Sequence, residues 1–233
     1  MILSTEILEK IDQGIFQLTD KEVEYHERQY KEVKEKSPLH YNIIGLPELY
    51  RDKTFSNFFI NESIKWVIDG IKNSLNEKNG LLVHGNTGTG KTHLAVARAK
   101  AMESNHIYTY YVEADMWAVK YFAPPIVRFI NMDELLSIIS DSGILRKPKT
   151  EIIKETTMHD LLILDDVDFE KMNPNKLEWT YLLINKLLEE SKKFIVTTNN
   201  SLNQIKTKDP RISSRLIGSC ETYEFLWDDY RAR

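Results

Sequence analysis

The stretch "HGNTGTGKTH" (residues 84–93) limits what this chain can fold into more than any other feature of its sequence. Gly85, Gly88, Gly90, Lys91 and Thr92 fit the pattern G-x-x-x-x-G-K-[ST] of a phosphate-binding loop. Such a loop turns its backbone N–H groups inward around a di- or triphosphate, and glycine readily adopts the positive φ angles that this requires. In this arrangement the lysine reaches the β- and γ-phosphates, and the threonine hydroxyl binds Mg²⁺.

The residues on either side of this loop supply the structural context that the motif needs. "NGLLVHG" before it predicts a short buried strand, and "THLAVARAKAM" after it predicts a helix whose positive N-terminus would face the phosphates. We therefore expect the loop to bind ATP or ADP through Gly85, Asn86, Thr87, Gly88, Thr89, Gly90, Lys91, Thr92 and His93.

Composition narrows the classes of protein that remain. The net charge is −4, so any contact with nucleic acid must come from a local basic patch. The single cysteine, Cys220, excludes an intramolecular disulfide and a cysteine-based zinc cluster, and it is typical of a reducing compartment. The sequence contains neither a signal-peptide pattern nor a run of about 18 apolar residues. We therefore expect a cytoplasmic protein that does not span a membrane.

Three regions follow one another along the chain. Residues 1–40 predict a small helical region, in which "TDKE" (residues 19–22) is a capping box that begins the second helix. Its charged face is either solvated or a docking site for another protein. Residues 41–60 resemble a linker that precedes the core, and residues 61–233 form the core.

Helices and strands alternate throughout the core. We expect strands over residues 80–84, 126–130, 161–165 and 193–197, and helices over residues 61–77, 91–103, 132–140, 149–157 and 174–190. Short apolar strands between helices predict an α/β fold with a parallel sheet that is covered by helices on both faces.

Two of the predicted strands end in polar residues suited to ATP hydrolysis. "DLLILDD" (residues 160–166) ends in Asp165, which suits an indirect Mg²⁺ ligand, and Asp166, which suits polarisation of the attacking water. "KKFIVTTNN" (residues 192–200) ends in Thr197, Thr198 and Asn199. A polar side chain there either holds the attacking water or belongs to an ordinary turn.

"DPRISSRL" (residues 209–216) places Arg211 and Arg215 on the same side of a predicted helical turn. These arginines either form surface salt bridges or provide an arginine finger. Such a finger reaches the γ-phosphate bound by a neighbouring subunit and neutralises charge in the transition state.

Taken in order, "GNTGTGKTHLA", "DLLILDDV", "IVTTNN" and "RISSRL" resemble the AAA+ ATPases of the DnaC/DnaI/IstB group, which contains replicative-helicase loaders and transposition helpers. The resemblance covers residues 45–233. It implies an AAA+ P-loop core without a C-terminal lid domain, since the residues after Arg215 are too few to form one. It departs from the group in two respects: the N-terminal region has no zinc-binding cysteines, and "LLINKLLEESKK" lacks an arginine that often follows this stretch.

The same resemblance assigns roles to single residues. It implies that Lys91 and Thr92 bind phosphate and Mg²⁺, and that Asp165 is the Mg²⁺ acid. In addition, it implies that Asp166 is the catalytic acid, Asn199 the γ-phosphate sensor, Arg215 the finger, Arg211 its companion and Arg231 a second sensor.

Two further segments are candidates for contact with DNA. The aromatic insertion (residues 107–125) is interpreted as packing into a core, or else as a base-stacking or partner-binding surface. Arg146, Lys147 and Lys149 form a basic cluster, which is either a solvated loop or a phosphate-binding site.

These observations favour an ATPase that uses ATP and Mg²⁺, forms a homo-oligomer when ATP is bound, and assembles on single-stranded DNA. Its N-terminal helices would bind a DnaB-type replicative helicase, which it would load in DNA replication. The alternatives are an IstB-like transposition helper and an adaptor that ATP switches with little turnover.

Overall fold

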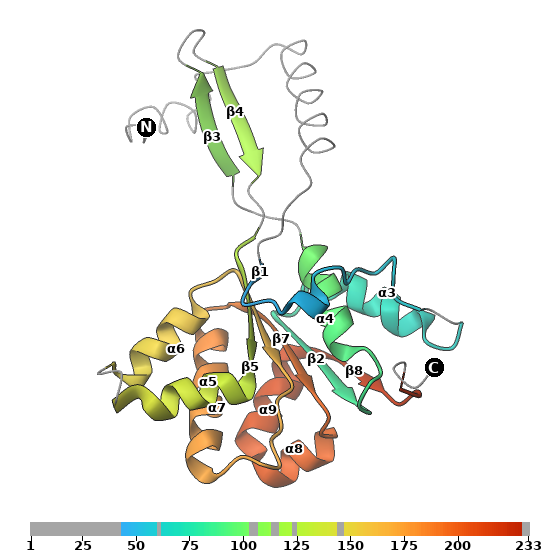
Figure 1. The fold of residues 1–233 in the computed structure, drawn as a ribbon, viewed down its shortest axis with the longest axis vertical. Helices are drawn as coiled ribbons and strands as arrows, with labels where there is room; N and C mark the ends of the chain where they lie inside the picture. Colours follow the sequence, from blue (N-terminus) through green and yellow to red (C-terminus); the bar gives the residue numbers. More distant parts are fainter. Residues whose placement is uncertain are drawn as a thin grey trace. The chain divides into compact units, whose positions relative to one another are not determined.

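A six-stranded sheet organises the larger of the two units into which the chain divides (Figure 1). All of its pairings are parallel. The strands lie in the order β1-β5-β6-β7-β2-β8, with bounds Ile43–Ile44 (β1), Gly80–Gly85 (β2), Val127–Asn131 (β5), Leu161–Asp165 (β6), Lys193–Thr198 (β7) and Cys220–Phe225 (β8). Because β7 pairs with both β2 and β6, the carboxyl ends of these three strands meet at one edge of the sheet.

This computed structural model describes residues 43–59, 62–102, 107–112, 117–122, 125–143 and 147–229, and of residues 107–112 and 117–122 only the backbone. The expected helices in residues 1–40, with Arg146 and Arg231, lie outside the described residues. The division of the chain at residues 40 and 60 stays a prediction. No helix among the described residues is long and apolar enough to cross a membrane.

Helices cover both faces of the sheet, as the sequence predicts (Figure 1). One face carries α3 (Lys65–Asn73) and α4 (Lys91–Lys100). The other carries α5 (Met132–Ser140), α6 (Lys149–Thr157), α7 (Pro174–Glu189), α8 (Leu202–Lys208) and α9 (Pro210–Ser219). Short 3₁₀ helices occupy Glu48–Tyr50 and Asp141–Gly143.

The alternation of side chains along each strand creates these two cores. In β6, Leu162 and Leu164 join the core beneath α5–α9, whereas Leu161 and Ile163 join the core beneath α3 and α4. Each of these four side chains is at most 1% exposed. Burying one such side chain contributes about 1.5–3 kcal/mol, which explains why the strands of this sheet read as continuous apolar runs.

The expected elements agree with the structure where the pattern is strong. The helices at 132–140 and 149–157 and the strand at 161–165 have the predicted bounds. The helix expected over 61–77 is shorter and covers only Lys65–Asn73; just beyond its C-terminal end, Leu75 adopts a left-handed conformation with φ of 63°, which does not continue the helix. Strands β1 and β8 were not predicted: β1 has two residues, and "CETYEF" in β8 is polar because it forms an edge of the sheet.

The aromatic insertion forms a hairpin that belongs to the other unit. Its strands β3 (Ile107–Val112) and β4 (Trp117–Phe122) are antiparallel, with Ile107 opposite Phe122 and Val112 opposite Trp117. The hairpin is therefore a two-stranded sheet of its own rather than an extension of the six-stranded sheet. The interpretations of its aromatic residues stay predictions.

Candidate nucleotide-binding and hydrolysis site

The phosphate-binding loop connects β2 to α4, which is the strand–loop–helix context that the sequence predicts. Gly85, Gly88 and Gly90 have φ angles of 122°, 74° and 90°. Residues that carry a side chain rarely adopt positive φ angles, so these three positions require glycine. Gly90 precedes α4 as its N-cap and supplies no side-chain cap, so the first-turn N–H groups of α4 are available to bind an anion.

Lys91 lies at the first position of α4 and is only 8% exposed. Its Nζ atom donates to the carbonyl oxygens of Gly85 and Asn86, at 3.0 and 2.5 Å. The ammonium group is therefore held inside the loop, at the position that the motif assigns to the phosphate-binding cation.

Thr92, Asp165 and Thr197 form a hydrogen-bonded cluster beside the loop. The hydroxyls of Thr92 and Thr197 both donate to Oδ1 of Asp165, at 2.8 and 2.6 Å. Burial raises the pKa of the Asp165 carboxyl above its ordinary value, while these two hydrogen bonds oppose that rise because they stabilise the ionised form.

This cluster fits a magnesium ion. Mg²⁺ prefers hard oxygen ligands and is usually held by one or two carboxylates together with substrate phosphates. Thr92 and Asp165, the two residues predicted as metal ligands, place a hydroxyl and a carboxylate oxygen side by side next to the phosphate-binding loop. Thr197 then acts as the residue that orients the carboxylate.

Asp166 and Asn199 meet at the same edge of the sheet. Nδ2 of Asn199 donates to Oδ1 of Asp166 at 3.1 Å, and the Asp166 N–H donates to Oγ1 of Thr197 at 2.9 Å. Asp166 has a φ of 53°, a left-handed conformation that aspartate tolerates better than most residues. The predicted catalytic acid and the predicted sensor are thus linked through β6 and β7.

His93 connects the start of α4 to the segment that precedes the core. Its Nε2 atom is hydrogen-bonded to the Thr54 carbonyl oxygen, at 2.8 Å, and its ring meets the Phe58 ring edge-on, with centroids 5.0 Å apart. Burial lowers the pKa of His93, which favours the neutral imidazole. These contacts give His93 a structural role, and nucleotide binding by its side chain stays a prediction.

Comparison with known proteins shows which family combines these features. The family model described as the bacterial DnaA ATPase domain matches residues 49–221. The chain belongs to this family. The chromosomal replication initiator protein DnaA of Treponema pallidum (strain Nichols) is 28% identical over 176 residues, which cover 72% of this chain and 34% of that protein. DnaA of Rhizobium johnstonii is 31% identical over 158 residues, which cover 66% of this chain and 28% of that protein. The chain therefore spans about a third of the length of these curated relatives.

Solved structures share the fold. Domain III of the Thermotoga maritima replication initiation protein DnaA superposes with a TM-score of 0.58 and 21% identity, over 75% of this chain and 67% of that chain. A DnaC helicase loader has the same TM-score and identity, over 77% and 99%. AMPPCP-bound DnaA from Aquifex aeolicus has a TM-score of 0.57 and 20% identity, over 80% and 53%. These similarities establish the AAA+ P-loop fold, while the narrower DnaC/DnaI/IstB assignment stays a prediction.

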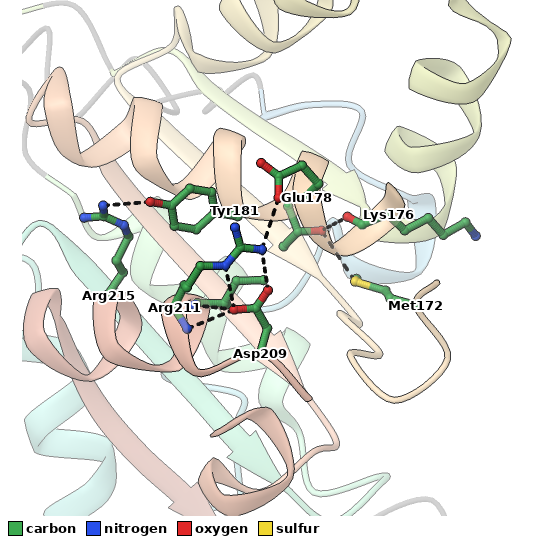
Figure 2. A network of polar contacts seen from close by, with 9 residues as sticks. Met172, Lys176, Glu178, Tyr181, Asp209, Arg211 and Arg215 are labelled. Carbon is green, nitrogen blue, oxygen red and sulfur yellow. Dashed lines mark hydrogen bonds and ion pairs between the residues drawn. The ribbon is translucent and has the colours of Figure 1, made fainter. Parts of the chain in front are cut away.

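In this DnaA-family core, the two predicted arginines belong to a network between α7 and α9 (Figure 2). Arg211 pairs with Glu178 and Asp209, at 3.1 and 2.9 Å. The guanidinium of Arg215 donates to the Tyr181 hydroxyl at 3.0 Å, and both arginines lie over the Tyr181 ring, at 4.6 Å (Arg211) and 5.2 Å (Arg215) from its centroid. Action of Arg215 on a neighbouring subunit stays a prediction.

The two described lysines of the predicted basic cluster already have partners within the chain. Lys147 forms an ion pair with Glu155, and Nζ of Lys149 lies 4.3 Å from the centroid of the Trp179 ring. Phosphate contacts by these two lysines would therefore compete with intramolecular partners.

Sequence reasoning missed two parts of the site. It listed Thr197 only as part of a polar strand end, although this residue holds both the Asp165 carboxylate and the Asp166 N–H. It also missed that the residues directly after β8 lie against the phosphate-binding loop, where the Trp227 indole N–H donates to the Thr89 carbonyl oxygen at 3.0 Å. The "WDD" that follows the polar β8 gave no periodic signal for this placement.

Proposed function

We propose that this chain binds ATP with Mg²⁺ and hydrolyses it to ADP and phosphate. The observation that carries this proposal is the cluster in which Thr92 and Thr197 both donate to the Asp165 carboxylate, beside a loop that holds Lys91. Mg²⁺ held there would neutralise charge on the β- and γ-phosphates. Membership in a family of ATPase domains supports the same activity.

The residues around this cluster divide the remaining work. The Asp166 carboxylate accepts a hydrogen bond from the attacking water and polarises it, while the Asn199 amide fixes the orientation of that carboxylate. Arg215 acts on the γ-phosphate bound by a neighbouring copy of the chain, and the Tyr181 ring and hydroxyl hold its guanidinium.

Phosphate release by purified variants tests the hydrolytic activity. Lys91→Ala should abolish nucleotide binding and turnover, whereas Lys206→Ala, which removes an exposed lysine from α8, should change neither. If Lys91→Ala hydrolyses ATP as fast as the unmodified chain, the loop is not the hydrolytic site.

Mixing two inactive variants tests the role of Arg215 in a neighbouring subunit. Arg215→Ala should bind ATP but lose turnover, by up to about 10³–10⁵-fold if the finger behaves as in other NTPases. Adding Asp166→Ala protein should restore part of the activity, because each variant supplies the group that the other lacks. The absence of rescue at every mixing ratio would contradict a finger that acts between subunits.

We further propose that the ATPase serves DNA replication as a helicase loader. The fold that this chain shares with a DnaC helicase loader and with DnaI supports the proposal. The region at residues 1–40 is proposed to bind a DnaB-type helicase. Helicase capture in the presence of ATP should be lost on deletion of residues 1–40, with ATP affinity retained as the control. Capture of a transposase instead, or of neither protein, would favour the transposition helper or the ATP-switched adaptor.

Single-stranded DNA is the second proposed partner. One solved structure of a replication initiator DnaA is bound to AMPPCP and single-stranded DNA, which supports a DNA path on this fold. The basic cluster that contains Lys147 and Lys149 is the proposed contact. If it binds phosphates, the joint change of Arg146, Lys147 and Lys149 to Glu should weaken oligonucleotide binding. In a plot of log affinity against log salt concentration, the slope should also become shallower by about 0.7 for each phosphate contact that is lost. An unchanged slope in fluorescence anisotropy would exclude this cluster.

A further inference from the structure

The residues after β8 run directly along the phosphate-binding loop. We call residues 226–229 the post-β8 segment. The Asn86 backbone N–H donates to the Phe225 carbonyl oxygen at 2.8 Å, and the Asn86 side-chain amide donates to the Leu226 carbonyl oxygen at 3.1 Å. Both hydrogen bonds join the first turn of the loop to the point where β8 ends and the segment begins.

A third hydrogen bond fixes the segment farther along the loop. The Trp227 indole N–H donates to the Thr89 carbonyl oxygen at 3.0 Å. The Trp227 ring also packs on the Phe225 ring, with centroids 4.2 Å apart, and Phe225 is fully buried. The segment is thus held to the loop at both ends of the glycine-rich turn.

These contacts bring the carboxylate of Asp229 to Gly88. A side chain added at Gly88 would overlap with both carboxylate oxygens of Asp229, which places that carboxylate against the α-carbon of Gly88 in the middle of the loop. The adjacent Asp228 is exposed. The chain therefore places one of two neighbouring carboxylates against a loop whose N–H groups and lysine are suited to an anion.

A phosphate and a carboxylate compete for such a loop because both are anions that need the same donors. Two like charges a few ångströms apart also repel each other, and this repulsion is strongest where water is partly excluded. An Asp229 carboxylate at Gly88 would therefore oppose the arrival of a di- or triphosphate as long as it stays in place.

We propose that the Asp229 carboxylate occupies the phosphate-binding loop in the absence of nucleotide, and that a bound nucleotide displaces it together with the post-β8 segment. The proposal rests on the nucleotide binding proposed above. Displacement breaks the contact between Trp227 and Thr89, so occupancy of the loop is transmitted to the segment. Return of the carboxylate after hydrolysis favours release of ADP.

Neutralising each carboxylate in turn tests this proposal. Asp229→Asn keeps the size of the side chain and removes its charge, and Asp228→Asn makes the same change at the exposed neighbour. At about 0.05 M NaCl, Asp229→Asn should tighten binding of a fluorescent ADP or ATP analogue by about tenfold, and Asp228→Asn by less than about twofold. The difference in affinity between Asp229→Asn and the unmodified chain should become smaller at about 1 M NaCl, because salt screens the repulsion. A merely structural role for Asp229 would not produce this salt dependence.

Tryptophan emission tests the displacement itself. Nucleotide should change the emission of the unmodified chain, and Trp227→Phe should lose that change while still binding the analogue. The proposal would be overturned if Asp229→Asn bound nucleotide equally or more weakly than the unmodified chain. It would also be overturned if nucleotide left the emission of the unmodified chain unchanged, or changed the emission of Trp227→Phe by the same amount. Both results leave the proposed ATPase standing as long as the unmodified chain binds nucleotide and Lys91→Ala does not, so the two failures are distinguishable.

Discussion

Replacing Thr197 by Val should change the ionisation of the proposed metal ligand Asp165 while leaving the fold in place. Valine has nearly the same shape but lacks the hydroxyl that donates to Asp165 at 2.6 Å and accepts from the Asp166 N–H at 2.9 Å. A hydrogen bond to a charged group contributes about 1.5–3 kcal/mol, so its loss destabilises the ionised form of Asp165. Burial already raises the pKa of this carboxyl, and the loss of the hydrogen bond should raise it further.

The direction of the pH effect follows from this shift. Asp165 must be ionised to bind Mg²⁺, and a higher pKa means that the ionised form is lost at a higher pH. The acid limb of Mg²⁺-dependent ATP hydrolysis should therefore move to higher pH in Thr197→Val. At neutral pH the variant should also need more Mg²⁺ for half-maximal activity.

Thr198→Val is the matched control, because it removes a buried hydroxyl from the next position of β7. That hydroxyl donates to the Val167 carbonyl oxygen at 2.5 Å and accepts from the Asn200 N–H, without any contact to Asp165. Each variant should lose about 1–3 kcal/mol of stability in denaturant titrations, but only Thr197→Val should move the pH profile. Identical profiles for the two variants would refute the conclusion that Thr197 tunes the Asp165 carboxylate.

Three further predictions follow from the same contacts. Asp165→Asn should abolish Mg²⁺-dependent turnover yet raise the melting temperature at neutral pH without nucleotide. The raised pKa means that ionised Asp165 costs stability above its unfolded-state pKa, so the gain should disappear as the pH falls toward that value. Tyr181→Phe should lower the ATPase rate without changing ATP affinity, because the ring stays while the hydroxyl that accepts from Arg215 is lost; an unchanged rate would contradict this. Burial raises the pKa of the Cys220 thiol to about 12, so iodoacetamide should label Cys220 only after unfolding. Rapid labelling of the native chain, detected by mass spectrometry, would contradict this burial.

The sequence predicted the parts of the fold whose residues carry their own signal. "LLILD" matches β6 at both ends, since a strand buried on both faces is apolar at every position until its terminal carboxylate. The three glycines at positive φ follow the same rule, because the backbone conformation of the loop demands a residue type that is visible in the sequence.

The parts that could not be predicted depend on which strands become neighbours. Thr197 and Asp165 are 32 positions apart, and their hydrogen bond exists because β7 pairs with β6. Periodicity within a strand reports which residues are buried, but it carries no information about the order of strands in a sheet. The role of Thr197 is therefore not visible in the sequence, although its polar side chain at the strand end is.

The order of strands also explains how residues after β8 come to face the nucleotide loop. β8 pairs with β2 in parallel, in a register that sets Gly85 opposite Phe225. Both strands therefore end at the same edge and at the same level, and whatever follows β8 must leave the sheet beside the residues that follow β2. The Asn86 N–H then finds the Phe225 carbonyl oxygen, and Asp229 reaches Gly88 within four residues. Under the proposal above, this sheet register is what lets a single charge at Asp229 control access to a site whose other residues lie far from it in sequence.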